Sequence, residues 1–173
     1  MAITATMVKE LREMTGAGMM DCKKALNESN GDMDAAIEYL RKNGEAKAVK
    51  KAGRIAAEGI VMADVKEDKT AAIVEVNSET DFVAKNEKFQ NYVADVAAQA
   101  MNTSAADIDA FLAETWKFDE TKTVNEALAG QIAIIGENMN IRRFQQVKED
   151  AGFVASYTHM GGKIGVLVDV ATD

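Results

Sequence analysis

The chain has 173 residues, of which 47% are hydrophobic, so it can form one sizeable core or two small ones and is neither a disordered tail nor a disulfide-stapled miniature protein. One cysteine excludes an internal disulfide, no apolar run approaches the roughly 18 residues of a membrane helix, and the start lacks secretory features, so we expect a cytoplasmic protein. A formal net charge of −8 argues against wrapping of nucleic acid and favours a protein partner.

The charge is unevenly distributed along the chain. Residues 1–54 contain 10 basic and 8 acidic side chains, a net charge of +2, whereas residues 55–173 contain 10 and 20, a net charge of −10. This asymmetry predicts two units with different surfaces.

The first unit is predicted to be a bundle of three short helices. Apolar residues recur at helical spacing in three stretches, separated by Gly16 and Gly18 and then by Asn30-Gly31. Asp32 is placed to cap the third helix, and Gly44 is placed to end it. The apolar positions are Met7, Leu11 and Met14, then Met19, Cys22, Ala25 and Leu26, and finally Met33, Ala36, Ile37 and Leu40.

Residues 45–54 follow as a separate basic segment. Small apolar residues alternate there with Lys47, Lys50, Lys51 and Arg54. The pattern indicates an exposed basic helix that links two domains, and a solvated linker with no further role is an equally simple interpretation.

From Ile55 the pattern changes to that of an α+β unit. Two β-branched runs flank the charged turn 66–69 and predict a hairpin, and a second hairpin is predicted to turn at Gly161-Gly162. Between them the spacing predicts a helix with Phe89, Val93, Val96, Ala97 and Ala100 on one face, a helix opening at Ser104 with Asp107 in a capping box, a helix from Thr123 to Gly136, and a strand over 141–147.

The two predicted hairpins resemble each other. When Asp81 is set against Asp173, Val74, Val76 and Thr80 align with Val166, Val168 and Thr172. Either the chain contains a weak internal repeat or two unrelated hairpins agree by chance. If the repeat is real, the second copy stops where it should enter a helix, so we expect a truncated product.

Groups for catalysis are scarce. Cys22 and His159 are single residues of their kinds and fall in different predicted units, so neither a Cys-His nucleophile pair nor a zinc site is expected. The sequence has no GxxxxGK[ST] segment to bind nucleotide phosphates. We therefore predict no enzyme activity, no cofactor and no metal site.

The segment 77–86, NSETDFVAKN, is the most informative. Phe82 lies in an otherwise polar junction between a strand and a helix, directly after Asp81. In one interpretation Thr80 or Asp81 caps the helix and Phe82 is a local hydrophobic staple. In the other, Phe82 projects as an anchor for a partner's pocket. Met19-Met20 at a helix start is a second candidate contact surface, because at least one of these side chains should face solvent.

Six segments together resemble the bacterial elongation factor Ts family along essentially the whole chain. They are TGAGMMDCKKAL, NGDMDAAIEYLRKNG, KAVKKAGRIAAEG, NSETDFVAKNE, IGENMNIRRF and SYTHMGGKIGVLV, in this order. The resemblance implies an N-terminal ubiquitin-associated-like domain of three helices with its basic linker helix over 1–54. It also implies an α+β core of two related halves, the first over 55–148 and the start of the second over 149–173.

The resemblance further implies a guanine nucleotide exchange factor for elongation factor Tu, which binds both its GDP-bound and its nucleotide-free form. Thr80, Asp81, Phe82 and Val83 match the family segment that enters the GTPase domain and dislodges Mg²⁺. Secondary contacts are implied for Met19, Met20, Lys23, Ile135 and His159.

Relatives of the family continue beyond the position that matches Asp173. We therefore expect weaker binding to elongation factor Tu than a full-length relative shows, and pairing of this chain with a second copy as a homodimer. The competing interpretation is a ubiquitin-associated-like adaptor that binds a protein without any effect on a nucleotide.

Overall fold

The computed structural model describes residues 2–172, which pack as two compact units. The first unit holds the residues before Arg54 together with residues 129–136, and the second holds residues 54–128 and those from Glu137 onward. The division into domains at 54/55 and 148/149 stays a prediction.

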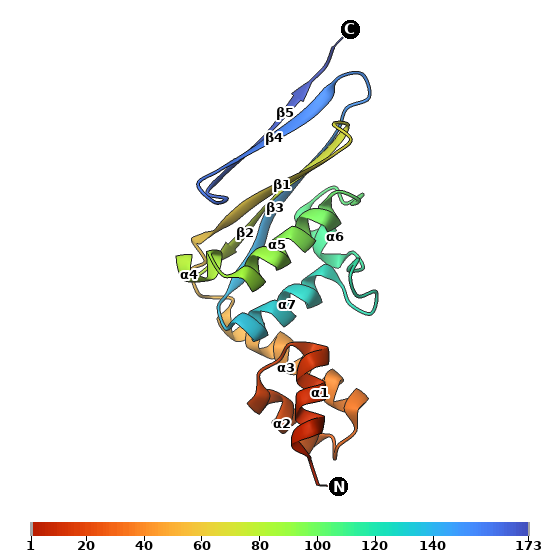
Figure 1. The fold of residues 1–173 in the computed structure, drawn as a ribbon, viewed down its shortest axis with the longest axis vertical. Coiled ribbons are helices and arrows are strands. Elements are labelled where there is room, and N and C mark those ends of the chain that lie inside the picture. The colour runs from red at the N-terminus through yellow and green to blue at the C-terminus, as the bar shows by residue number, and fades with distance from the viewer. Residues whose placement is uncertain (1, 173) are drawn as a thin grey trace. The chain divides into compact units, whose positions relative to one another are not determined.

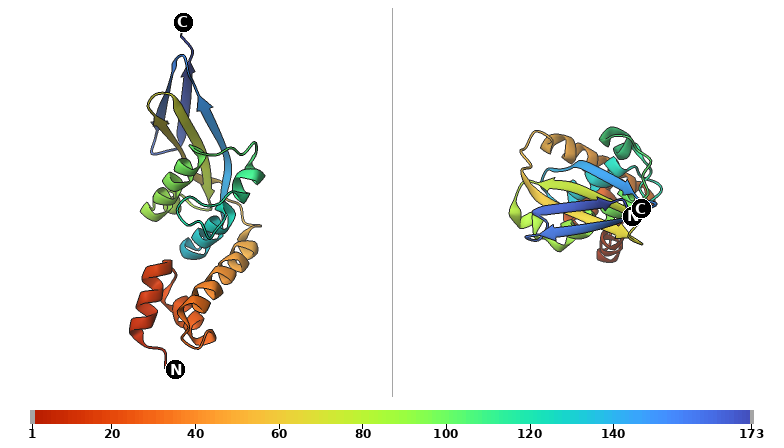
Figure 2. Two further views of the ribbon diagram at one scale, coloured as in Figure 1. Left: turned by 90° about the vertical axis from the view of Figure 1, so that its right-hand side faces the viewer. Right: turned by 90° about the horizontal axis from the view of Figure 1, so that it is seen from above.

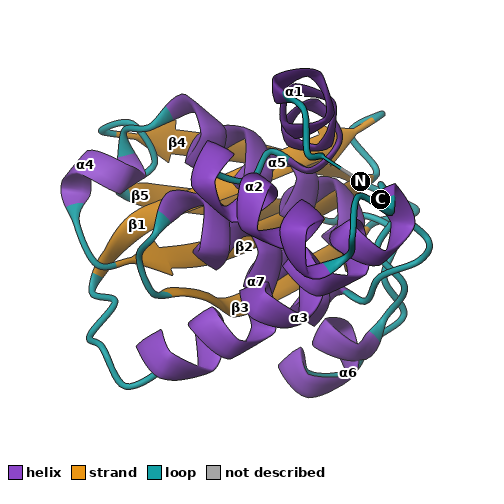
Figure 3. Cartoon of the chain, turned by 90° about the horizontal axis from the view of Figure 1, so that it is seen from below, coloured by secondary structure: helices purple, strands orange, loops and turns teal. Residues whose placement is uncertain are grey.

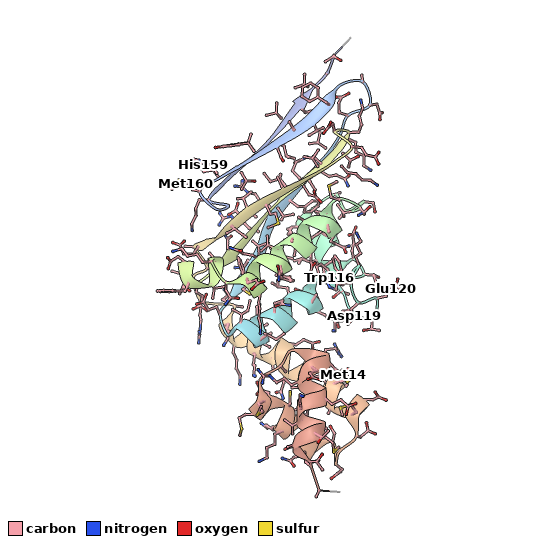
Figure 4. All side chains as sticks on the ribbon, in the orientation of Figure 1. Met14, Trp116, Asp119, Glu120, His159 and Met160 are labelled. Atoms are coloured by element: carbon pink, nitrogen blue, oxygen red, sulfur yellow. The ribbon has the colours of Figure 1, made fainter. Side chains whose placement is uncertain are left out.

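The first unit contains the expected three helices, α1 (Ala5–Thr15), α2 (Met19–Glu28) and α3 (Met33–Lys51) (Figure 1). Gly16, at a φ of 68°, ends α1, and the Asp32 carboxylate caps α3 by accepting a hydrogen bond of 2.8 Å from the Ala35 amide. The helices enclose a buried core of Val8, Leu11, Cys22, Ala25, Leu26 and Ala36. Met14 was predicted on the apolar face, but it is 58% exposed (Figure 4).

The third helix is longer than predicted. Gly44 does not end it, and the basic segment continues α3 as far as Lys51 instead of forming a helix of its own. Gly44 is buried against α7 (Val124–Ile135), where an added Cβ atom would lie 3.6 Å from the Ala133 Cβ. Gly44 therefore lies at a packed contact with α7 and not at a helix end, which a sequence pattern of single helices does not reveal.

The second unit is built on an antiparallel sheet with the strand order β1-β2-β3. Strands β1 (Glu58–Lys66) and β2 (Thr70–Ser78) form the predicted hairpin, and β3 (Met139–Lys148) pairs with β2. Helix α5 (Glu87–Ala100) packs on this sheet and buries Phe89, Val93 and Val96 (Figure 1). The apolar face predicted for this helix is confirmed.

Two short helices also belong to the second unit. Helix α4 (Asp81–Ala84) follows β2, and α6 (Ile108–Ala113) packs on β3 through stacked rings of Phe111 and Phe144, 4.6 Å apart. The prediction that α6 opens at Ser104 was wrong, because Asp107 is itself the N-cap and accepts from the Ala110 amide. The Thr103 hydroxyl and the Ser104 amide instead bond the Glu114 carboxylate, which keeps this segment out of the helix.

A second hairpin, β4 (Phe153–His159) and β5 (Ile164–Val170), lies beside β1 and β2 (Figures 1 and 2). Gly162, at a φ of 91°, accepts a hydrogen bond of 2.6 Å from the Val61 amide, and an added Cβ atom there would lie 2.9 Å from the Ile60 Cβ. Val154 is buried on the inner face of the hairpin. The outer face is exposed and apolar, with Phe153, Tyr157, Ile164, Val166 and Val168 all more than 40% exposed.

Helices and antiparallel sheets occur together in the chain, so the predicted α+β class is confirmed (Figure 3). The equivalents of Thr80 and Asp81 in the suspected repeat are Thr172, which lies beyond β5, and Asp173, which lies outside the described residues. Among the described helices, none is both long and apolar enough to cross a membrane.

Candidate partner-binding site

The segment Thr80–Val83 is held at the end of β2 by a helix cap. The Thr80 backbone is extended, with φ −125° and ψ 155°, and its hydroxyl accepts a hydrogen bond of 3.4 Å from the Val83 amide. Helix α4 is only four residues long, with its last residue, Ala84, buried and with Val83 and Asp81 partly exposed. The capping role proposed for Thr80 is therefore confirmed.

Phe82 points away from the protein. Its side chain is 82% exposed, whereas Phe89, seven residues later on α5, is completely buried. A hydrophobic staple would require Phe82 to pack on a neighbouring turn, and such a contact is incompatible with this exposure. An exposed aromatic side chain on a capped turn is instead suited to enter a pocket of another protein. Its role in binding stays a prediction.

Asp81 and Lys85 form an ion pair one helical turn apart, with 2.7 Å between the Asp81 Oδ2 and the Lys85 Nζ. The hydrogen bond and the charge of Lys85 lower the pKa of Asp81 below its ordinary value of 3.8, and Lys163 adds a smaller effect of the same sign. The pair correspondingly raises the pKa of Lys85 above 10.5. Because the helix is short, this pair is one of the few interactions that favour it from within.

We expect the pair to stabilise α4 only where both groups are charged. The pKa of Asp81 is lower in the folded state than in the unfolded chain. The stabilisation that the ion pair gives is therefore present above about pH 3.8 and is lost as the pH falls through the folded-state pKa. In an NMR titration, Lys85→Met should move the Asp81 midpoint up toward 3.8. The matched exposed change Lys88→Met should leave it unmoved, and an equal effect of both variants would contradict this assignment.

Two glutamates hold the base of the segment. The Glu137 carboxylate accepts from the amides of Glu79 and Thr80, at 3.1 and 3.0 Å, and from the Thr80 hydroxyl at 2.7 Å. The Glu79 carboxylate accepts from the Asn138 amide at 2.5 Å. We call this arrangement the Glu79–Glu137 clamp. Glu137 was missed by sequence reasoning, although it lies within the segment IGENMNIRRF that contributed to the resemblance.

The first unit holds four of the secondary candidates. Met19 and Met20 open α2 and are 56% and 75% exposed, and Lys23 is exposed one turn later. Their neighbour Asp21 pairs with Lys47 at 2.8 Å, which fixes α2 against α3. Ile135 ends α7 in the same unit and is partly buried. The three exposed side chains of α2 can therefore contact a partner directly.

His159 lies at the end of β4, beside the turn of the second hairpin (Figure 4). It is exposed, and its Nδ1 atom lies 2.9 Å from the Tyr157 hydroxyl, with the two rings stacked. Within the second unit, the hairpin turn is tied to β1 by the ion pair between Lys163 and Glu58. His159 is thus held at a fixed edge of the unit.

The two residues considered for nucleophilic or metal chemistry belong to different units, Cys22 to the first and His159 to the second. Cys22 is buried in the helical bundle, and burial raises the pKa of its thiol, which opposes formation of a nucleophilic thiolate. No cluster of three or more His, Cys, Asp or Glu side chains in this range is arranged to hold a metal ion. The exposed segment around Phe82 is therefore the principal candidate site.

Comparison with known proteins agrees with the resemblance found in the sequence. A family model described as Elongation factor TS matches residues 79–173, which include the Phe82 segment and the second hairpin. Elongation factor Ts of Clostridium tetani is 57% identical over 169 residues, which cover 97% of this chain and 56% of that protein.

Two further relatives give the same result. Elongation factor Ts of Trichlorobacter lovleyi is 55% identical and covers 100% of this chain, and that of Halothermothrix orenii is 55% identical and covers 98%. The match covers 56% of the first of these proteins and 57% of the second. The chain thus spans about half the length of the curated relatives it matches.

Proposed function

Because the chain belongs to the elongation factor Ts family, we propose that it is a translation elongation factor that binds GDP-bound elongation factor Tu and promotes release of GDP. The observation that supports this most directly is Phe82, which is 82% exposed on a capped turn inside the matched region. In this proposal the chain works by binding and catalyses no covalent reaction.

The proposed mechanism is insertion of Thr80–Val83 into the partner's GTPase domain. Phe82 enters between partner helices, and the resulting shift dislodges the Mg²⁺ that bridges the nucleotide phosphates and the partner. Loss of a divalent cation from a cluster of phosphate charges weakens GDP binding strongly. By linkage, the chain then binds the nucleotide-free partner more tightly by the same factor.

The secondary contacts proposed for Met19, Met20, Lys23, Ile135 and His159 would orient the chain on the partner. Exposed methionines adapt to varied surfaces, and Lys23 can pair with an acidic group. The exposure of Met19, Met20, Lys23 and His159 supports this role, and Ile135 would contribute its partly exposed side chain.

The alternative is an adaptor that binds a protein through the three-helix bundle alone. Release of a fluorescent GDP from elongation factor Tu separates the two functions. The exchange-factor proposal requires a small, substoichiometric amount of the chain to accelerate release of all the bound GDP. An adaptor would leave the dissociation rate unchanged at every concentration.

We also propose that the exposed apolar face of β4–β5 pairs with a second copy of this chain. Tyr157 and Val166 lie opposite each other on that face and are 60% and 41% exposed. Burial of such a face against an identical one removes apolar surface from water at both strands.

Sedimentation of the 173-residue chain should therefore show association that grows with concentration. Val166→Glu should weaken it at least tenfold, since a desolvated charge at a pairing face costs more than ~1.4 kcal/mol. Val49→Glu changes a 76% exposed valine on α3 and serves as the control. A chain that stays monomeric at all concentrations would contradict the pairing. So would a Val49→Glu variant whose association is weakened as much as that of Val166→Glu.

A further inference from the structure

We infer that Glu137 is the positioning residue for Phe82, acting through the Glu79–Glu137 clamp. This inference rests on the proposed function, because positioning of Phe82 matters only if Phe82 meets a partner. The hydrogen bonds that Glu137 accepts from this segment come from the Glu79 and Thr80 amides and the Thr80 hydroxyl, so its effect on Phe82 is transmitted through the backbone of these two residues.

The clamp begins where the β-sheet ladder ends. The last paired residues of β2 and β3 are Ser78 and Met139. Beyond this pair, hydrogen bonds to the Glu137 carboxylate take the place of the backbone hydrogen bonds between the strands. The carboxylate accepts from the amides of Glu79 and Thr80, the two residues that follow β2. The Glu79 carboxylate in turn accepts a hydrogen bond from the backbone amide of Asn138, which precedes β3.

These bonds are charge-assisted and partly shielded from water. Glu79 is only 21% exposed, and Asn138 is 3% exposed. Asn138 in turn donates from its side-chain amide to the Arg54 carbonyl at 2.7 Å. Hydrogen bonds to an ionised acceptor are roughly twice as strong as neutral ones, so the clamp holds this junction more firmly than an ordinary loop.

Helix α4 needs such external support. It has four residues, and the amides of Ala84 and Lys85 make its helical bonds to the Thr80 and Asp81 carbonyls, at 3.3 and 3.1 Å. Nucleation of a helix is unfavourable, so a single turn does not persist by its own bonds. Glu137 supplies the support by fixing Thr80, which is both the cap of α4 and the start of its hydrogen-bonded turn.

As a consequence, the Phe82 side chain is exposed to solvent and yet held in a defined direction by the clamp. A partner then does not have to order the turn when it binds, which removes part of the entropic cost of association. The chain thus presents a preorganised anchor on the end of a sheet strand.

The test is a double-mutant cycle read by GDP release from elongation factor Tu. Glu137→Ala should lower the release rate about fourfold, and Phe82→Ala about tenfold. If Glu137 acts only through Phe82, the double variant should be about tenfold slower, no worse than Phe82→Ala. A double variant about fortyfold slower would mean independent effects and would overturn the inference.

Glu75→Ala is the matched control. Glu75 also binds across β2 and β3, through an ion pair of 2.7 Å with Arg143, but it lies on the strand before the clamp. It should lower thermal stability as Glu137→Ala does while leaving GDP release unchanged. Equal loss of GDP release in both variants would reduce Glu137 to a structural role and overturn the inference.

A measurement without the partner keeps this inference separate from the proposed function. In the free chain, Glu137→Ala should speed hydrogen exchange of the Ala84 and Lys85 amides about fivefold, with no change at Val74 in β2. Unchanged exchange at α4 would overturn the positioning role. If the chain does not accelerate GDP release from elongation factor Tu at all, the proposed function is wrong. The hydrogen-exchange result still decides whether Glu137 positions the segment.

Discussion

Phe82→Ala is expected to slow GDP release from elongation factor Tu about tenfold while the free energy of unfolding changes by less than about 0.5 kcal/mol. The first expectation follows from the anchor role proposed for Phe82. The second follows from its 82% exposure, because a side chain that is already in water loses little packing on truncation. Thermal melts and GDP release measured on the same variant give both quantities.

Phe118→Ala is the control for this prediction. Phe118 is also an exposed aromatic residue of the second unit, at 51%, and it lies in the loop between α6 and α7. Its removal should leave GDP release unchanged. If Phe82→Ala instead lowers the melting temperature strongly, the side chain supports the fold as a staple and the anchor role is wrong.

Phe89→Ala should differ from Phe82→Ala in its effect on stability. Phe89 is completely buried on α5, so its truncation is expected to cost about 3 to 5 kcal/mol of unfolding free energy. That loss is a large fraction of the ~5 to 15 kcal/mol that stabilises a typical domain under native conditions.

The chemical change is the same as in Phe82→Ala, so the pair of variants compares a buried and an exposed phenylalanine seven residues apart. Urea unfolding with an unchanged slope gives the difference in stability directly. A loss below about 1 kcal/mol for Phe89→Ala would show that α5 does not pack on the sheet as described.

Local features of the fold were predictable because neighbouring residues determine them. Asp32 caps α3, and the Thr123 hydroxyl accepts from the Glu126 amide in a reciprocal capping box at the start of α7. The first hairpin turns at Glu67 and Asp68, both at positive φ, inside the charged segment that predicted it. Each of these features depends on side chains only a few residues apart.

Features that depend on tertiary contacts were not predictable. A glycine near the end of an apolar helical pattern is typical of a C-cap, yet Gly44 lies inside α3, where it is buried against α7. Likewise, Ser104 has the composition of a helix start, but its amide bonds Glu114, ten residues away. In both cases a partner distant in sequence outweighs the local preference.

The candidate site was predictable only in part. An aromatic residue in a polar junction marked Phe82, and the sequence alone left a staple and an anchor as alternatives until exposure separated them. Glu137 could not be found in this way, since it lies 57 residues from Thr80 and has no distinguishing local pattern. Only the pairing of β2 with β3 brings the two residues together.

We propose above that the Phe82 segment promotes GDP release by displacing Mg²⁺ from the partner. The most direct test measures the dissociation rate of fluorescent GDP from elongation factor Tu, with and without a saturating amount of the chain, first in excess Mg²⁺ and then in EDTA. A smaller acceleration is expected in EDTA, because the cation that the chain displaces has already been removed. Equal acceleration in both buffers would contradict it.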